Sequence, residues 1–353
     1  MTSLTERKKS FINLGKFLSD FCQKKTDKTR DLDVPEEYFE RLQHLIQMSK
    51  INNPWFTEEN IFLSLESWAE ALTESHIDQW LVPYEINSTP PKTIALIAAG
   101  NLPMVGFHDL LCVLICGHKA VVKQSSKDKF LMPFMVEILE YFESALSGQV
   151  VFTEEKLTDF DAVIATGSNN TSRYFEYYFR NKPHIIRKNR TSVAVLSGNE
   201  TKEQLSELGK DIFCYFGMGC RNVSKIYIPE NYDLNLIFNA LYDYHPIINH
   251  DKYANNYDYH KAIYLMNGEE FLDNGFLMLK KEVQLHSPTA VSYYEYYGSE
   301  LQLKETLKVQ DSDIQCIVSH NFIPNEVPFG KTQQPQLWDY ADGVDTVNFL
   351  LKI

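Results

Sequence analysis

The sequence lacks the excess of basic residues that nucleic-acid-binding surfaces need. Its 353 residues include 34 Lys and Arg against 47 Asp and Glu, which gives a formal net charge of −13 at pH 7. Because binding to a phosphate backbone depends on clustered Lys and Arg, we expect no nucleic-acid partner. An acidic surface also disfavours anionic membranes. A single phosphate-bearing ligand is compatible with this charge, since a few cations and backbone N–H groups suffice to bind it.

The sequence also lacks an uninterrupted hydrophobic run and a recognisable leader segment. The stretch 93–122 is apolar on the whole, but Asn101, Asp109 and Lys119 interrupt it, and a lipid-spanning helix would leave these groups unsatisfied. Residues 1–17 are polar and amphipathic, with no apolar core and no small-residue cleavage site. We therefore expect no membrane span and a cytoplasmic protein.

The six cysteines show no spacing typical of a disulfide framework or a metal site. Cys112 and Cys116 lie in the apolar stretch LLCVLICG, where buried reduced thiols are expected because free cysteine behaves as a small hydrophobic residue. The sequence contains no CxxC, HExxH or GxGxxG motif. It therefore predicts no metal site and no ordinary dinucleotide-binding loop.

The apolar patterns predict a helical start followed by alternating strands and helices. Residues 1–85 show helical spacing, for example at Phe11, Leu14 and Leu18. From residue 92 apolar strands alternate with helices, which predicts right-handed crossovers and a parallel sheet buried on both faces. The expected strands are 92–100, 119–125, 149–154, 160–168, 191–198, 224–231, 289–297 and 314–320. The expected helices are 105–116, 130–146, 172–179, 201–217 and 233–244.

Cys220 is the first candidate for chemistry. It lies in GMGCRN, between a predicted helix and a predicted strand, where Gly217 and Gly219 permit close approach to the backbone. Arg221 beside it would favour the thiolate, which is the nucleophilic form. Taken alone, a cysteine beside glycine is more often structural.

Two further motifs follow predicted strands, where open parallel sheets bind ligands. Asn101, in AAGNLPMVG, carries an amide that can donate to a developing oxyanion, or else closes the turn before Pro103. The motif VVKQSSK offers Lys123, Ser125 and Ser126 and no carboxylate. This favours a 2′-phosphate, hence NADP over NAD, unless the segment is a solvated basic turn.

A fourth motif, IATGS, places Gly167 and Ser168 after a strand and before a helix. Backbone N–H groups at a helix start suit an anion such as pyrophosphate, although TGS turns are common. No single motif is specific, but their order resembles the aldehyde dehydrogenase superfamily over roughly 90–350, including a late Phe-Gly turn in PFG at 328–330. The N-terminal helices, the length and GMGCRNVSKIYIP look closest to the LuxC-like acyl-CoA reductases, whose bioluminescence members reduce fatty acyl groups to aldehydes.

The resemblance implies an aldehyde-dehydrogenase-like α/β fold in three segments. Residues 1–88 would be a helical segment that ends near the connection STPP. Residues 89–197 would be a parallel-sheet, cofactor-binding domain, joined by 331–353. Residues 198–330 would be a second α/β domain, which carries the catalytic cysteine.

The resemblance also implies roles for the residues of these motifs. Cys220 would be the nucleophile, and Asn101 would donate to the oxyanion beside the backbone N–H of Cys220. The cofactor-binding residues would be Lys123, Ser125 and Ser126 near the adenosine ribose, and Gly167 and Ser168 near the pyrophosphate. Ser126 falls where NAD-preferring relatives often carry Glu, which agrees with NADP. Tyr215, Phe216 and Tyr293 would line an acyl tunnel or pack in the core.

One departure from the superfamily bears on the reaction. Hydrolytic aldehyde dehydrogenases carry Glu-Leu-Gly-Gly before the strand that precedes the nucleophile, and this sequence has Arg187-Lys188-Asn189-Arg190 in about that place. Without that Glu, water is a poor acceptor of the acyl group, and a thiol such as coenzyme A is favoured. The cations here would either meet cofactor phosphates or form a solvated turn.

The resemblance thus implies an enzyme that reduces an acyl-CoA, with a fatty acyl group, to an aldehyde with NADPH through a thioester on Cys220. Alternatives on the same fold are an acyl phosphate reductase, a semialdehyde dehydrogenase or a catalytically silent binding subunit. A cysteine hydrolase is less favoured because no Cys-His pairing is visible. Expected partners are acyl-CoA or another acyl thioester, a protein that transfers the acyl group, and a second copy in a homodimer.

Overall fold

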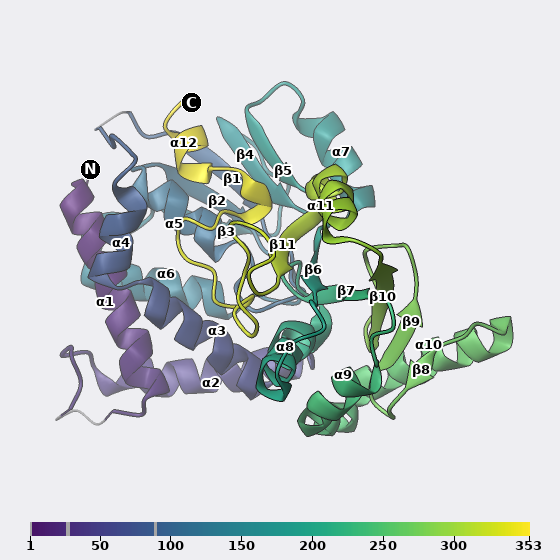
Figure 1. Ribbon diagram of the computed structural model, residues 1–353. Coiled ribbons are helices and arrows are strands. Elements are labelled where there is room, and N and C mark those ends of the chain that lie inside the picture. The colour runs from purple at the N-terminus through teal and green to yellow at the C-terminus, as the bar shows by residue number, and fades with distance from the viewer. Residues whose placement is uncertain (1, 26–28, 88–89) are drawn as a thin grey trace. The chain divides into compact units, whose positions relative to one another are not determined.

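The computed structural model describes residues 2–25, 29–87 and 90–353 (Figure 1). The chain divides into two compact units, Met1–Lys188 with Pro335–Ile353, and Asn189–Gln334. Each unit has its own β-sheet. The predicted boundary between residues 88 and 89 lies outside the described residues.

The first unit begins with helices, as predicted. They are α1 (Leu4–Cys22), α2 (Glu36–Asn52), α3 (Glu58–Ala71) and α4 (Glu74–Leu81). Three of them start at a side chain that caps the first turn, namely Ser3, Thr57 and Thr73. Their apolar faces join one core with the sheet and its covering helices.

The sheet of the first unit is entirely parallel. Its strands are β1 (Thr93–Ile97), β2 (Lys119–Lys123), β3 (Val150–Thr153), β4 (Ala162–Thr166) and β5 (His184–Arg187). Their order in space is β3-β2-β1-β4-β5. The chain runs outward from β1 in one direction to β2 and β3, and then in the other to β4 and β5. The order therefore reverses between β1 and β4, and such a reversal is where open α/β sheets bind ligands.

Both faces of this sheet are buried, which explains its apolar strands. Ile94 and Leu96 of β1 belong to the main core, whereas Ala95 between them packs in a separate cluster with Phe175 and Phe179. The covering helices are α5 (Phe107–Ile115), α6 (Leu131–Phe142), α7 (Asn169–Phe179) and the C-terminal α12 (Thr346–Leu350). Short 3₁₀ turns η1 (Ser144–Leu146) and η5 (Ala341–Gly343) complete the unit.

The C-terminal segment of the chain packs in the first unit. Leu337, Val347 and Leu350 are buried in its main core. The Nε2 atom of His118 lies 3.0 Å from the carbonyl oxygen of Leu350, so the start of β2 is hydrogen-bonded to α12. This unit is therefore built from two stretches of chain that are far apart in sequence.

The sheet of the second unit is parallel except at one edge. Its strands are β6 (Thr191–Val195), β7 (Val223–Pro229), β8 (Leu272–Asp273), β9 (Met278–Lys281), β10 (Val291–Tyr297) and β11 (Ile314–Val318). The order is β11-β6-β7-β10-β9-β8, with β8 and β9 antiparallel. Strand β6 lies in the segment 89–197 that is predicted as the first domain, and it pairs with β7 and β11 in this second sheet. The cofactor-binding and catalytic roles of the domains stay a prediction.

Helices and 3₁₀ turns connect the strands of the second unit. They are α8 (Lys202–Phe213), η2 (Cys214–Gly217), α9 (Asn235–Ala240), η3 (Tyr242–Asn249), α10 (Asp251–Asn267), α11 (Glu300–Val309) and η4 (Asp311–Asp313). Across the described parts of the chain, no helix has the length and apolar character needed to cross a membrane.

Candidate active site

The strand-end motifs of the first unit lie at one edge of its sheet. Asn101 follows β1, Lys123 ends β2, and Gly167 follows β4. Because β1 pairs in parallel with both β2 and β4, the carboxyl ends of the three strands are neighbours. The Asn101 side chain is exposed at this edge.

The turn after β1 is packed tightly against the turn after β2. A side chain at Gly100 would bring its Cβ within 2.6 Å of the Ser125 Cβ, so only glycine fits there. The N–H of Ala98 donates to the carbonyl of Lys123 at 3.1 Å. The backbone that carries Asn101 is therefore held against the segment that carries the predicted cofactor-binding residues.

Asp128 holds the turn after β1 in place through a hydrogen bond to its backbone. Its Oδ2 accepts a hydrogen bond of 2.6 Å from the backbone N–H of Met104, whose φ of +58° is unusual for a residue with a side chain. Burial raises the pKa of Asp128 to about 6, although the bond from Met104 opposes this. Sequence reasoning missed this residue, and a charged side chain in a turn carries no signal of burial.

A cavity of about 490 Å³ opens beside the carboxyl ends of β2 and β3. Its lining residues are Lys123, Gln124, Ser125, Ser126, Lys129, Phe152, Thr153 and Glu154. All three residues predicted near the adenosine ribose are thus brought together. The lining offers two cations and three hydroxyls beside one carboxylate, a set that suits a phosphate and sugar hydroxyls. Lys129 and Glu154 were not predicted.

Gly167 and Ser168 precede α7, as predicted. The Ser168 Oγ caps the helix by accepting from the N–H of Thr171 at 3.3 Å. A Cβ at Gly167 would lie 3.0 Å from the ring of Phe175, so glycine lets the strand end approach the helix closely. The Ser168 side chain is therefore engaged in capping, and the backbone N–H groups of the first turn are what this segment offers to an anion.

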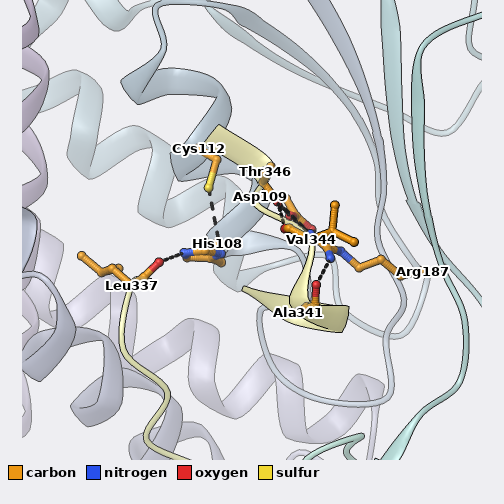
Figure 2. A network of polar contacts seen from close by, with 8 residues as sticks. All are labelled: His108, Asp109, Cys112, Arg187, Leu337, Ala341, Val344 and Thr346. Carbon is orange, nitrogen blue, oxygen red and sulfur yellow. Dashed lines mark hydrogen bonds and ion pairs between the residues drawn. The ribbon is translucent and has the colours of Figure 1, made fainter. Parts of the chain in front are cut away.

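Arg187 is not part of a solvated turn, because its guanidinium is buried and bonded to other residues of the first unit. It ends β5 and is only 4% exposed. Figure 2 shows its guanidinium against Asp109 of α5, with Nε–Oδ2 and Nη2–Oδ1 distances of 3.3 and 2.5 Å. Nη1 also donates to the Ala341 carbonyl at 2.6 Å, and Nη2 donates to Thr346 Oγ1 at 3.0 Å.

The cations that follow Arg187 have other partners. Lys188 pairs with Glu176 at 2.9 Å on the surface of the first unit. Arg190 lies in the second unit, where Nη1 donates to the Ile314 carbonyl at 3.2 Å. Neither contact by itself indicates a coenzyme-binding role for Lys188 or Arg190.

Cys220 lies in the turn between η2 and β7 of the second unit. Of the six cysteines, all within the described residues, Cys220 alone is exposed. Behind it, the Oδ1 atom of the buried Asn222 accepts from the N–H of Gly219 at 2.8 Å. The Nδ2 atom of Asn222 donates to the carbonyls of Asp211 and Cys214 at 3.0 and 2.9 Å. One side chain thus ties the cysteine turn to the end of α8.

Ser192 supports the same turn from β6. Its Oγ donates to the carbonyl of Cys220 at 3.0 Å and lies 3.0 Å from the Cys316 Sγ on β11. Ser192 is fully buried, so this hydrogen bond is shielded from water. Cys220 is therefore an exposed thiol on a backbone held from two sides.

The backbone just before the turn is strained. Tyr215, Phe216 and Gly217 have consecutive φ values of +52°, +58° and +74°. A left-handed conformation costs a residue with a side chain roughly 1–2 kcal/mol, and such residues cluster at functional sites.

The aromatic residues near this turn pack in the core. Tyr215, Phe216 and Tyr293 are all buried. A cavity beside Phe216 has a volume of about 20 Å³, which is too small for an acyl chain. This cavity therefore provides no acyl tunnel.

Asp211 joins the late Phe-Gly turn to the cysteine turn. Its Oδ2 accepts from the N–H of Gly330 at 2.7 Å, and its Oδ1 accepts from the N–H of Thr332 at 3.0 Å. Burial raises the pKa of Asp211 to about 6, against the lowering effect of these two bonds. Since the Asp211 carbonyl is bonded to Asn222, one network spans α8, the PFG turn and the turn of Cys220.

Sequence reasoning did not find the supporting residues. Asn222, two positions after Cys220 in GMGCRN, was within view of the motif. Asp211 is a charge beside the apolar positions Leu208 and Ile212 of a helix, which is a signal of a buried polar role. The pairing of Ser192 depends on strand order, which the sequence does not reveal.

Solved structures with this fold include aldehyde dehydrogenases. Aldehyde dehydrogenase 21 from Physcomitrella patens, in complex with succinate, is 11% identical with a TM-score of 0.65 over 99% of this chain and 84% of that one. Mycobacterium tuberculosis aldehyde dehydrogenase, complexed with NAD⁺, is 14% identical with a TM-score of 0.62 over 90% and 73%. P. syringae indole-3-acetaldehyde dehydrogenase, complexed with NAD⁺ and IAA, is 13% identical with a TM-score of 0.61 over 90% and 72%. The chain therefore has the aldehyde dehydrogenase fold, as predicted.

The family follows from the sequence itself. The family model "Acyl-CoA reductase (LuxC)" matches residues 19–237, which include Asn101 and Cys220. No curated protein matches the chain. The chain belongs to the LuxC acyl-CoA reductase family and is an enzyme of the acyl-CoA reductase and aldehyde dehydrogenase type.

Proposed function

We propose that this enzyme reduces a fatty acyl-CoA to the aldehyde with NADPH, through a thioester on Cys220. The net reaction consumes acyl-CoA, NADPH and a proton, and yields the aldehyde, NADP⁺ and coenzyme A. The observation that carries the proposal is the exposed thiol of Cys220 on a turn held by Asn222 and Ser192, in a member of the LuxC family. A nucleophile needs this combination of access and fixed backbone.

The proposed first step forms the acyl-enzyme. The Cys220 thiolate attacks the carbonyl carbon of the acyl-CoA, and a carbon–sulfur bond to Cys220 forms. The bond to the coenzyme A sulfur then breaks, and that thiolate takes a proton. The Asn101 amide and the Cys220 backbone N–H would donate hydrogen bonds to the oxyanion that exists between the attack and the departure of coenzyme A. The assignment of Asn101 rests on the family resemblance of its NLP motif and on its exposure after β1.

The surroundings of Arg187 support a thiol rather than water as the acyl partner. Hydrolytic relatives carry an activating glutamate at about this place, and this chain has a buried arginine bonded to Asp109. We therefore expect little hydrolysis of the acyl-enzyme.

NADPH, when bound, would supply the hydride that reduces the acyl group. The cavity at the ends of β2 and β3 supports a dinucleotide there, and the residues that would hold a 2′-phosphate are Lys123, Ser125, Ser126 and Lys129. The start of α7, at Gly167 and Ser168, would take the pyrophosphate. The NAD⁺ bound in several solved aldehyde dehydrogenase structures supports a nicotinamide dinucleotide in general. Glu154, which can accept from a ribose hydroxyl, is the feature of this cavity that favours NAD.

The test is NADPH oxidation with acyl-CoAs of short, medium and long chain. We expect turnover with the longer chains, and loss of at least about 10⁴-fold in Cys220→Ala because covalent catalysis is abolished. Cys22→Ala removes a thiol from α1, far along the chain, and should keep full activity. Turnover that survives in Cys220→Ala would refute the covalent mechanism.

The same assay separates the alternatives. Turnover of acyl phosphates but not acyl-CoAs would indicate an acyl phosphate reductase, and NADP⁺-dependent oxidation of a polar semialdehyde would indicate a semialdehyde dehydrogenase. Activity only after addition of an acyl-transferring protein would establish that partner. No activity with any donor would favour a silent binding subunit.

Cofactor choice is tested at Ser126. We expect Ser126→Glu to lower kcat/KM for NADPH about tenfold or more and to spare NADH, because a carboxylate repels the 2′-phosphate, and 1.4 kcal/mol is tenfold. Ser147→Glu makes the same charge change at an exposed site of the same unit and should leave the ratio of the two kcat/KM values unchanged. An NADH preference in the wild type would refute the assignment to NADP.

A further inference from the structure

A second cavity lies in the first unit, at the start of β2 rather than at its end. Its volume is about 580 Å³, within the range typical of small-molecule sites. Residues from several elements line it, among them Arg7, Gly117, Lys119, Leu4, Leu114 and Leu146. We propose that this cavity binds a small organic anion, whose acidic group contacts Arg7 and whose apolar part lies along the leucine side chains.

Arg7 carries this proposal because it is a buried cation without an acidic partner. Its side chain is 7% exposed. Nε donates to the Ile115 carbonyl at 3.1 Å, and Nη1 donates to the Thr2 carbonyl. No carboxylate of the described residues forms an ion pair with it. Since a guanidinium has five N–H donors, most of its hydrogen-bonding capacity is left for a ligand.

The charges around Arg7 do not neutralise it. The Ile115 carbonyl belongs to the carboxyl end of α5, which carries about half a negative charge, but Arg7 also lies in the first turn of α1, which carries about half a positive charge. The acid whose charge acts on Arg7 is Glu6, which also lines the cavity, and its carboxylate accepts from the Ser3 N–H at 2.7 Å in the helix cap. A buried cation is normally paired, so this one calls for an anion.

The local backbone makes room for the guanidinium. Gly117 has a φ of +82°, and a Cβ there would lie 3.4 Å from Arg7 Nη1 and 3.6 Å from its Cζ. The guanidinium thus lies against the glycine. Lys119, exposed at the first position of β2, adds a second cation to the lining.

His118 is not a ligand candidate, because both of its ring nitrogens are engaged. Nδ1 accepts from the Lys92 N–H at 3.2 Å, and Nε2 lies 3.0 Å from the Leu350 carbonyl. The acidic group of a ligand is therefore expected on the cations Arg7 and Lys119. The competing interpretation is that Arg7 only joins α1 to α5, in which case an added anion would not bind.

The test uses 8-anilinonaphthalene-1-sulfonate, which combines an acidic group with an apolar body and fluoresces when bound. We expect saturable binding to the full chain and to Lys50→Met, which removes an exposed cation of the same unit that lines neither cavity. Arg7→Met, which keeps the length of the side chain, should bind at least tenfold more weakly. Octanoate should displace the probe from the wild type.

Ala145→Phe provides a second variant in case Arg7→Met does not fold. Ala145 is exposed and lines the cavity, so a phenyl ring there fills the space and leaves Arg7 in place. We expect it also to weaken the probe at least tenfold. Equal binding to the wild type and Ala145→Phe would overturn the site. Displacement by inorganic phosphate but not by octanoate would overturn the organic character of the ligand. This test is independent of reductase activity.

Discussion

Asn222 connects three backbone segments behind Cys220 through three hydrogen bonds. Its side chain is 2% exposed, so removal leaves buried donors and acceptors without partners. Each such group costs about 1–3 kcal/mol. The effect of Asn222 on activity is therefore expected to come through the position of the Cys220 turn.

We expect Asn222→Ala to lower the free energy of unfolding by about 3 kcal/mol and to lower kcat more than it raises KM. Urea unfolding and steady-state kinetics measure both quantities. Asn235→Ala removes an exposed amide at the start of α9 and serves as the control. An Asn222→Ala protein with normal kcat would show that the turn does not need this support.

Asp211 makes stability depend on pH in an unusual direction. Burial raises its pKa from the ordinary 3.8 to about 6, so the folded protein binds a proton more readily than the unfolded chain. Stability from this group is fully present below about pH 4 and is lost as pH rises through about 6. Relative to Asp211→Asn, the wild-type free energy of unfolding should fall by up to roughly 3 kcal/mol over this window.

The measurement is urea unfolding at pH 4 to 7 for the wild type and Asp211→Asn. Asp233→Asn, an exposed site of the same unit, is the control. A wild-type free energy of unfolding that rises with pH relative to that of Asp211→Asn would contradict the assignment.

Single residues differ in how far the sequence reveals them. Cys220 and Asn101 could be proposed because glycine or a strand end marks each one, and because the order of motifs resembles a family. Asn222 and Ser192 could not, because their partners lie elsewhere in the chain. Arg187 was misinterpreted because nothing in the motif RKNR indicates that this arginine forms a buried ion pair with Asp109 of α5.

Among secondary-structure elements, α5 and β5 are joined by the ion pair of Asp109 with Arg187, and α12 is joined to them by the hydrogen bond from Arg187 to Thr346 (Figure 2). Asp109, Arg187 and Thr346 contribute one side chain each, and all three are buried. Burial disfavours the charged guanidinium, but Asp109 raises the pKa of Arg187 above its ordinary value. Loss of one partner would strand the other charge in the core.

We expect Arg187→Met to destabilise the first unit by about 3–5 kcal/mol, and Asp109→Leu combined with it to recover much of the loss. The rate of amide hydrogen exchange should increase most in α12, because this helix loses its hydrogen bond to β5. Arg180→Met, an exposed arginine at the end of α7, should change stability by no more than about 0.5 kcal/mol. An additive double variant would show that the two residues act separately.

The elements with clear apolar periodicity were predicted, and the rest were not. Strand β5 was missed because it has four residues and polar flanks. Helix α10 was missed because tyrosine, asparagine and lysine alternate along it without one apolar face. The helix expected over 201–217 ends at Phe213, since Tyr215 and Phe216 adopt left-handed conformations that only tertiary packing can enforce.

At the scale of the whole molecule, the two units differ in how they are built from the chain. The second unit is one continuous stretch with its own sheet and core. The first unit needs residues 335–353, because Leu337, Val347 and Leu350 complete its core. The homodimer stays a prediction.

We expect a fragment of residues 189–334 to unfold cooperatively by itself, and a fragment of residues 1–188 to lack a cooperative transition. Circular dichroism during urea titration measures this. Adding a peptide of residues 335–353 to the 1–188 fragment should restore part of the transition. Cooperative unfolding of 1–188 alone would show that the tail is dispensable to that core.

The discontinuity of the first unit affects how this unit folds during synthesis on the ribosome. Domains generally fold in the order in which they emerge. Here the N-terminal part of the first unit must wait for α12, which is made after the whole of the second unit. The second unit can fold first, while the apolar surface that α12 will cover stays exposed until α12 has been synthesised. A chaperone that binds nascent chains would therefore bind the apolar surface that α12 later covers.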